Sequence, residues 1–181
     1  MTTYHDIVLV HEHTPEIIAM AKRLGYASLL FAVKDSREAA VVRQAASAQG
    51  SISCSLAFLD RSPNQHASET LVLRPAAADL RATLEHARKA IVVTSSRLDQ
   101  VACASAQRNE NTICLPLGDI LRGNTANAVW NIRLCRTYLV RTAIASLAAN
   151  PLDLRGPLDI ISLFARLGME PATARAALQK I

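Results

Sequence analysis

Aromatic side chains are scarce in this sequence. Its 181 residues include 3 Phe, 3 Tyr and 1 Trp, which together make up only 4%. Proteins that bind single-stranded nucleic acid commonly stack successive bases on clusters of aromatic rings. We therefore expect no stacking platform here, and any contact with RNA would depend on basic side chains that meet phosphate groups.

Other absences exclude further classes of protein. Neither a Gly-x-Gly-x-x-Gly pattern nor a P-loop follows any expected strand, so the usual sign of a nucleotide-binding sheet is missing. The Gly-x-Ser-x-Gly motif of serine hydrolases is missing as well. No apolar run approaches the length of a membrane span, and the polar residues 2–6 show no signal-peptide pattern.

The four cysteines are scattered along the chain, without the paired spacing of a zinc site or a redox motif. We expect reduced and mostly buried thiols in a cytoplasmic protein: Cys54, Cys103, Cys114 and Cys135. Cys54 is the one cysteine with a plausible histidine partner, but it falls in the middle of an expected strand and should be buried, so we identify no nucleophile.

Small aliphatic residues dominate what is present. Half of the residues are apolar, and Ala, Leu and Val are the main types, a composition that suits buried parallel strands flanked by Ala-rich helices. The length fits a single domain over residues 1–181. Lys and Arg exceed Asp and Glu by 20 to 15, a net charge of +5, which is compatible with a polyanionic partner.

Apolar runs and helical patterns alternate from end to end. The runs predict strands at residues 7–10, 27–33, 52–59, 70–73, 91–94, 113–117 and 142–147. This alternation across short loops predicts an α/β fold with an all-parallel sheet, for which an open doubly wound sheet and a closed barrel both remain possible. Seven strands are one fewer than in a standard (β/α)₈ barrel, and residues 60–65 are expected to be a loop with no helix.

Local signals mark where several helices begin. Thr14 is expected to cap the first helix. Residues 35–38 and 96–99 both have capping patterns, and Asn124 with Thr125 opens a long helix whose exposed face carries Arg133 and Arg136.

The helix with the clearest boundaries lies near the C-terminus. Pro157 suits its first position, Asp159 is expected to accept hydrogen bonds from free N–H groups in its first turn, and Gly168 ends it. Arg155 directly precedes this helix. It could form a salt bridge with Asp153 or Asp159, or it could bind a phosphate beside the helix N-terminus.

Two segments carry a resemblance to a known family. The first has the order Arg-x-Pro-x-Asp at residues 155–159, an aliphatic run, a Gly-Met turn and an Ala-rich helix at residues 172–178. The second is residues 113–121, followed by an Asn-rich turn and a long basic helix. Together they resemble the ribonuclease P protein component 3 family over roughly the last 70 residues. The first hundred residues match only in the order of their elements.

The resemblance implies a TIM-like barrel whose last two helices close one end. It also implies a protein subunit of ribonuclease P, which supports the catalytic RNA in 5′ maturation of precursor tRNA and has no chemistry of its own. The implied partners are the ribonuclease P RNA, precursor tRNA indirectly, ribonuclease P protein component 2 and the other protein subunits. The chain would bind no cofactor, and the RNA would need Mg²⁺.

Arginines form the expected interface for RNA or for a partner protein. We select those at loops and on the basic helix: Arg74, Arg97, Arg122, Arg133, Arg136, Arg141 and Arg155. Arg74, Arg97 and Arg122 each follow a strand, so they would project from the same end of a parallel barrel. Each could instead be solvated surface or a local ion pair, because such pairs are common and weak.

A second function class depends on His11 and His13, which follow the first strand. Alternate histidines at such a strand end resemble the first metal-binding motif of barrel hydrolases. A working metal site needs three or four ligands, and only the His66 loop could supply another histidine, so we expect no metal. The metal-dependent hydrolase is therefore the alternative to the ribonuclease P subunit, and a scaffold without RNA contact is a third possibility.

Overall fold

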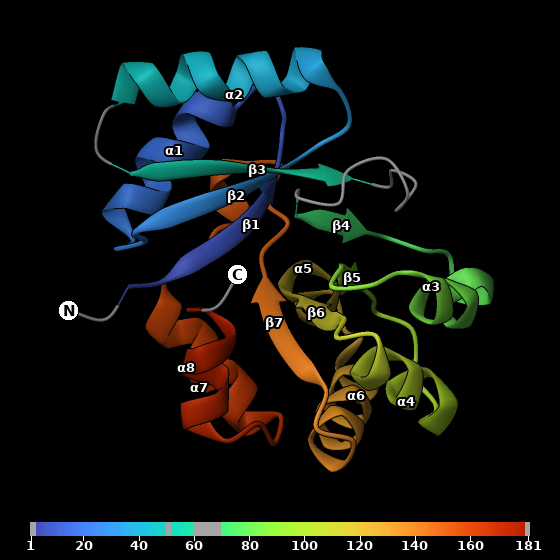
Figure 1. Cartoon of the computed structure of the whole chain (residues 1–181). Helices are drawn as coiled ribbons and strands as arrows, with labels where there is room; N and C mark the ends of the chain where they lie inside the picture. The colour runs from blue at the N-terminus through green and yellow to red at the C-terminus, as the bar shows by residue number, and fades with distance from the viewer. Residues whose placement is uncertain (1–2, 50–51, 60–69, 180–181) are drawn as a thin grey trace.

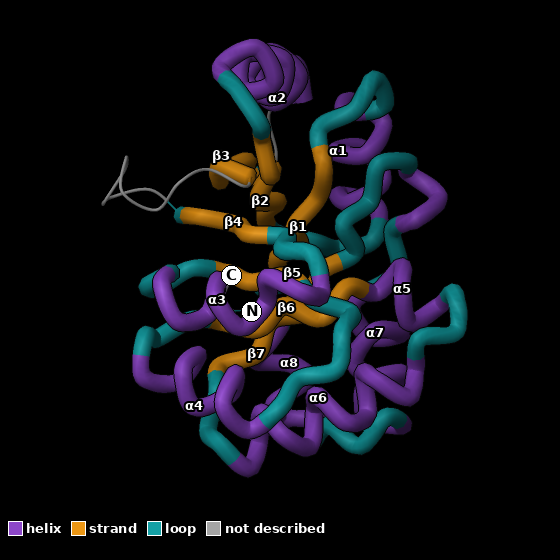
Figure 2. Tube along the Cα trace, turned by 90° about the vertical axis from the view of Figure 1, so that its right-hand side faces the viewer, coloured by secondary structure: helices purple, strands orange, loops and turns teal. Residues whose placement is uncertain are grey.

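The computed structural model describes residues 3–49, 52–59 and 70–179. Seven strands form one sheet in sequential order, and every neighbouring pair is parallel. The strands are β1 (His5–Leu9), β2 (Ser28–Val33), β3 (Ser53–Leu59), β4 (Leu71–Leu73), β5 (Ile91–Val93), β6 (Thr112–Pro116) and β7 (Arg141–Ala145). The sheet curls into a nearly closed barrel of the TIM-like α/β type, as predicted, with helices outside the strands (Figures 1 and 2).

The helices alternate with the strands along most of the chain. They are α1 (Thr14–Arg23), α2 (Ser36–Gln49), α3 (Leu80–His86), α4 (Gln100–Arg108), α5 (Leu117–Leu121), α6 (Thr125–Thr137), α7 (Pro157–Arg166) and α8 (Pro171–Ala177). Two short 3₁₀ turns, η1 (Ala77–Asp79) and η2 (Pro151–Asp153), precede α3 and α7. None of the helices in the described ranges is long and apolar enough to cross a membrane.

Three local expectations were wrong in detail. Leu117 does not end β6 but begins the short helix α5, which no pattern predicted. Thr14 lies inside α1, and its hydroxyl donates to the carbonyl of His11 instead of capping the helix. The pattern at residues 96–99 starts no helix at Ser96, because Asp99 is itself the cap and accepts from the N–H of Ala102 at 2.7 Å.

The capping pattern at residues 35–38 is confirmed. The Asp35 carboxylate accepts from the N–H of Glu38 at 2.9 Å, and the Glu38 carboxylate accepts from the N–H of Lys34 at 2.7 Å. The two bonds satisfy backbone donors at the start of α2. The loop predicted at residues 60–65 lies outside the described residues.

Small side chains fill the inside of the barrel. The buried residues there are Ile7, Leu30, Ala32, Ala57, Val72, Ile91, Val93, Cys114, Ala143 and Ala145. A closed sheet narrows as its strand number falls, so a seven-stranded barrel has room for less side-chain volume than one with eight. The alanines at four of these ten positions fit that restriction.

Backbone hydrogen bonds join the first strand to the segment that follows the last. The N–H of Leu147 donates to the carbonyl of Ile7 at 3.0 Å, and the N–H of Leu9 donates to the carbonyl of Ala148 at 3.0 Å. Leu147 adopts a φ of 50°, a value uncommon for a residue with a side chain, so the contact between β1 and this segment departs from a regular strand pair. We refer to the contact between β1 and residues 146–148 as the seam.

The C-terminal helices pack beside the start of β1 and against β7. In Figure 1, α7 and α8 lie below β1 and beside β7. The carbonyl of Leu178, just after α8, accepts from the N–H of His5 at 2.7 Å, and Leu178 is fully buried. Phe164 of α7 is also fully buried, in the cluster that α4, α6 and β6 share. The last two helices therefore pack against the outside of the barrel beside β1 and β7.

A buried carboxylate lies in the seam. Asp6 is fully buried, and its Oδ1 accepts from the N–H groups of Ile7 and Ser146, both at 2.8 Å. Its Oδ2 has no hydrogen-bond partner in the described part of the chain. Burial raises the pKa of Asp6 to about 7, although the hydrogen bonds from Ser146 and Ile7 act in the opposite direction.

This raised pKa predicts how stability depends on pH. In the unfolded chain the Asp6 carboxyl has a pKa near 3.8, so as pH rises it loses its proton before the folded protein does. The contribution of Asp6 to stability is therefore fully present below pH 3.8 and is lost as pH rises through about 7. At about 1.4 kcal/mol per pKa unit, the loss is on the order of 4 kcal/mol. Asp6→Asn should remove this decline, because an amide does not titrate. Urea unfolding of both proteins from pH 4 to pH 8 measures it, and parallel pH profiles would contradict the assignment.

Candidate functional site

A polar cavity of about 250 Å³ opens at the C-terminal ends of β6 and β7. Three of the arginines selected from the sequence line it, together with two aspartates. The lining residues are Arg74, Pro116, Gly118, Asp119, Leu121, Arg122, Ser146, Leu147, Asp153 and Arg155. We call this space the arginine cavity.

Parallel strand direction brings the three arginines together. Arg74 directly follows β4, Arg122 caps the end of α5 after β6, and Arg155 follows η2 after β7. All three segments leave the same end of the barrel, because the carboxyl ends of parallel strands share one rim. Residues separated by more than 80 positions in sequence therefore line one space.

The guanidinium groups in the cavity are partly occupied by the protein itself. Arg122 forms an ion pair with Asp119 one turn earlier. Arg155 pairs with neither aspartate proposed for it: its Nη1 donates to the carbonyls of Leu152 at 2.6 Å and Leu154 at 2.8 Å. These bonds orient Arg122 and Arg155. Each guanidinium carries five N–H donors, so further donors remain for an anion.

The backbone at Arg155 is anchored to the barrel wall. Its carbonyl accepts from the hydroxyl of Tyr26 at 2.9 Å. Tyr26 is buried with the α1 and β2 residues, and burial together with the nearby Asp6 carboxylate raises the pKa of its hydroxyl, which stays a proton donor. The linker that carries Arg155 is thus fixed on both sides of the arginine.

Three asparagines from the start and face of α6 hold the loop that follows β5, a feature that the sequence reading missed. Asn131 is fully buried, its amide donates to the carbonyl of Ser96 and its oxygen accepts from the N–H of Leu98, both at 2.9 Å. Two more asparagine amides donate to the carbonyl of Ser95: Asn124 at 2.8 Å and Asn127 at 3.0 Å. The Asn-rich turn could have suggested backbone contacts, but not which loop accepts them.

Arg97 lies on this loop, and it does not line the arginine cavity. Its guanidinium carbon lies 3.9 Å from the centroid of the Trp130 ring, in a cation–π contact. The Trp130 indole N–H donates to the carbonyl of Leu98 at 2.9 Å, which fixes the ring. Arg97 therefore leaves the same end of the barrel as Arg74 and Arg122, as expected, but lies outside the cavity that they line.

The remaining selected arginines lie elsewhere. Arg133 and Arg136 are exposed on α6, and Arg141 begins β7 at the opposite end of the barrel from the cavity. Arg141 donates to the carbonyl of Glu110. The seven selected arginines therefore do not form one surface: three line the arginine cavity, and Arg136 and Arg141 line a second pocket.

The start of α7 follows the prediction in part. Pro157 occupies the first helical position after Gly156, as expected. Asp159 lies in the first turn, but its carboxylate accepts no hydrogen bond within the described ranges, so the capping role proposed for it was wrong. Its contribution reduces to the favourable placement of a negative charge near the positive end of the helix.

His11 and His13 lie apart from the arginine cavity, in the turn between β1 and α1. With Glu12 they form the one group of three metal-ligating side chains found in the described segments. Among the described residues, no histidine lines the arginine cavity. A barrel hydrolase would need metal ligands and substrate groups in one space, and these two sets of residues do not provide that arrangement.

Comparison with solved structures finds a chain of the same fold. No family model matches this chain, and no curated protein matches it in sequence. A chain in the cryo-EM structure of archaeal ribonuclease P with mature tRNA superposes with a TM-score of 0.74 at 18% sequence identity. The match covers 96% of this chain and 86% of that chain. At this identity the likeness establishes a shared fold over nearly the whole length of both chains.

Asn131 offers a test of the loop contacts. Asn131→Ala removes two buried hydrogen bonds and leaves the groups at Ser96 and Leu98 without partners, so we expect a loss of about 2 to 3 kcal/mol in the free energy of unfolding. Asn127→Ala is the matched control, since Ser95 keeps the amide of Asn124, and its loss should stay near or below about 1 kcal/mol. Denaturant unfolding measures both variants. Equal losses would mean that the Asn131 bonds do not hold the loop.

Proposed function

We propose that this chain is a protein subunit of ribonuclease P of the component 3 type. The observation that carries the proposal is the likeness of fold to a chain of archaeal ribonuclease P over 96% of this protein. The two resembling sequence segments, at residues 113–121 and 155–178, support it independently. The residues of these segments also line much of the arginine cavity, among them Asp119 and Arg155.

The proposed role is to bind and support the catalytic RNA, not to perform chemistry. The cavity offers three guanidinium groups and two carboxylates, and its described lining residues include no serine, cysteine or histidine arrangement that would activate a nucleophile. Arginine presents planar sets of donors that match phosphate oxygens. The chain would act in the cytoplasm with the ribonuclease P RNA, component 2 and the other protein subunits, would meet precursor tRNA indirectly, and would need no cofactor beyond the Mg²⁺ of the RNA.

The arginine cavity is the phosphate-binding part of this proposal. Arg74→Ala, Arg122→Ala and Arg155→Ala should each weaken RNA binding and lower the log–log salt slope by about 0.7 to 0.9, the contribution of one phosphate contact. The expected result is measured on the complex of this chain with its partner proteins and the ribonuclease P RNA, by titration at several salt concentrations. Cleavage of precursor tRNA by the same complex gives the functional readout.

Arg43→Ala is the matched control, because Arg43 is an exposed arginine on α2, away from the cavity. It should leave both the salt slope and cleavage unchanged. Arg155→Ala also removes bonds to two carbonyls, so its melting temperature must be measured alongside. A lower melting temperature with an unchanged salt slope would refute the phosphate role of Arg155. Cleavage that is equally fast without the whole chain would refute the proposed function.

A further inference from the structure

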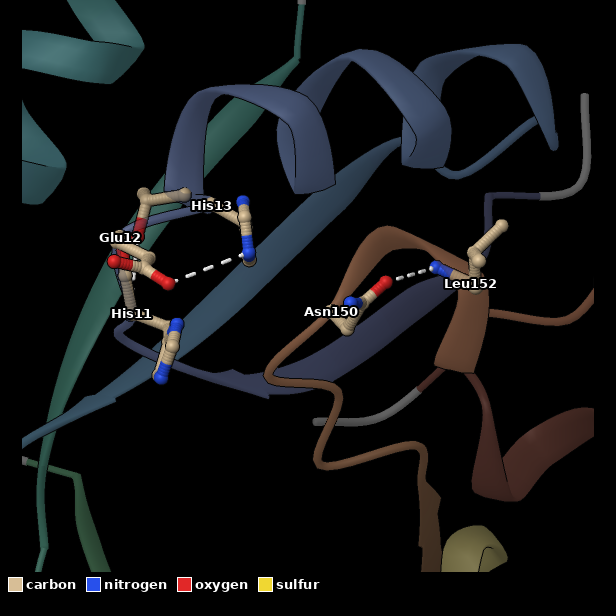
Figure 3. Close-up of polar contacts among 6 residues, drawn as sticks. His11, Glu12, His13, Asn150 and Leu152 are labelled. Carbon is tan, nitrogen blue, oxygen red and sulfur yellow. Dashed lines mark hydrogen bonds and ion pairs between the residues drawn. The ribbon is translucent and has the colours of Figure 1, made fainter.

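The turn between β1 and α1 gathers three potential metal ligands. One nitrogen of His11, one nitrogen of His13 and one carboxylate oxygen of Glu12 all lie within 4.8 Å of one another. The Nε2 atom of His13 is 3.5 Å from Oε1 of Glu12, and the two imidazole rings stack with their centroids 5.7 Å apart. Figure 3 shows the rings side by side, with the Glu12 carboxylate directed toward His13.

The backbone of this turn is held in place before any ion arrives. The hydroxyl of the fully buried Thr14 donates to the carbonyl of His11 at 2.6 Å, and the N–H of His11 donates back to that hydroxyl at 3.2 Å. The N–H of Ile17 donates to the carbonyl of His13 at 2.9 Å, and this bond holds the backbone of His13 against the first turn of α1. A fixed backbone lowers the entropy that ligand residues lose when they bind an ion together.

The donor types select a class of metal. Two imidazole nitrogens and one carboxylate oxygen suit Zn²⁺ and neighbouring divalent transition metals, whereas Mg²⁺ and Ca²⁺ prefer sites made of oxygen alone. The side chains of Glu12 and His13 are 75% and 42% exposed, so water can complete the coordination. The N-terminal end of α1 carries a partial positive charge that opposes a cation, and the Glu12 carboxylate supplies the compensating charge.

We propose that His11, Glu12 and His13 form a binding site for a divalent transition metal ion such as Zn²⁺. The site is separate from the arginine cavity. The evidence for it is the arrangement of these three side chains, which does not depend on the proposed role in ribonuclease P. Sequence spacing alone suggested the two histidines, and the fold of the turn adds Glu12 as the third ligand.

Calorimetric titration of the purified chain with ZnCl₂, in the presence of a non-chelating reductant, tests the site. The wild-type chain should bind one ion that the double variant His11→Ala/His13→Ala binds at least about 100-fold more weakly, since loss of even an outer-shell partner costs about 10- to 100-fold. Glu12→Gln keeps the size of the side chain and removes its charge, and it should weaken binding by about tenfold or more. Because these residues are largely exposed, each variant should melt at the wild-type temperature without zinc.

His86→Ala is the matched control, because His86 is an exposed histidine at the end of α3. It should bind zinc as the wild type does. Equal zinc binding by the double variant and the wild type would place the ion elsewhere, for example on thiols, and would overturn the proposal, as would the absence of binding to the wild-type chain. In the reconstituted complex the double variant should still support cleavage of precursor tRNA. Loss of cleavage with folding intact would overturn the separation of this site from the RNA-supporting role.

Discussion

The barrel depends on the seam between β1 and the segment after β7. Six strand pairs can form in an open sheet, and in the described part of the chain the backbone bonds of Ile7 and Leu9 with residues 147 and 148 turn that sheet back on itself. At the same junction the Asp6 carboxylate accepts a hydrogen bond from the N–H of Ser146. In a regular strand pair, a backbone carbonyl of the neighbouring strand would accept this bond. The fold therefore places a titratable side chain at the seam, where a side chain replaces a backbone partner in the hydrogen bonding that closes the barrel.

Closure has a direct consequence for the surface. An open parallel sheet would spread the loops after its strands along one edge, whereas a barrel gathers them into a ring. Arg74, Arg122 and Arg155 share a cavity for this reason, although they follow different strands. The hydrogen bonds from α6 to residues 95–98 then determine which way the β5 loop turns, and they direct Arg97 onto Trp130 instead of into the cavity.

The sequence predicted the strands better than it predicted the site, and barrel closure came only from the resemblance. Apolar runs flanked by turn residues identify buried strands because burial on both faces requires them, and all seven strands were located this way. Helix starts were less certain, since Ser96 and Asp99 both have capping chemistry and only packing selects Asp99. Three other features depend on the path of the backbone in three dimensions: the partner of Asp6, the contacts of Asn131, and the position of Glu12 between two histidines. Residue spacing does not encode that path.

The segment from residue 146 to residue 156 connects these parts physically. It begins in the seam, where Ser146 binds Asp6, contributes Leu147, Asp153 and Arg155 to the cavity, and ends at the start of α7. Two buried side chains from the N-terminal part of the chain anchor it: Asp6 of β1 and Tyr26, which lies between α1 and β2. A change in the protonation of Asp6 therefore acts on the same short segment that positions Arg155. Since packed interiors shift between discrete arrangements and do not deform freely, the geometry of the cavity and the stability of the barrel should respond to Asp6 together.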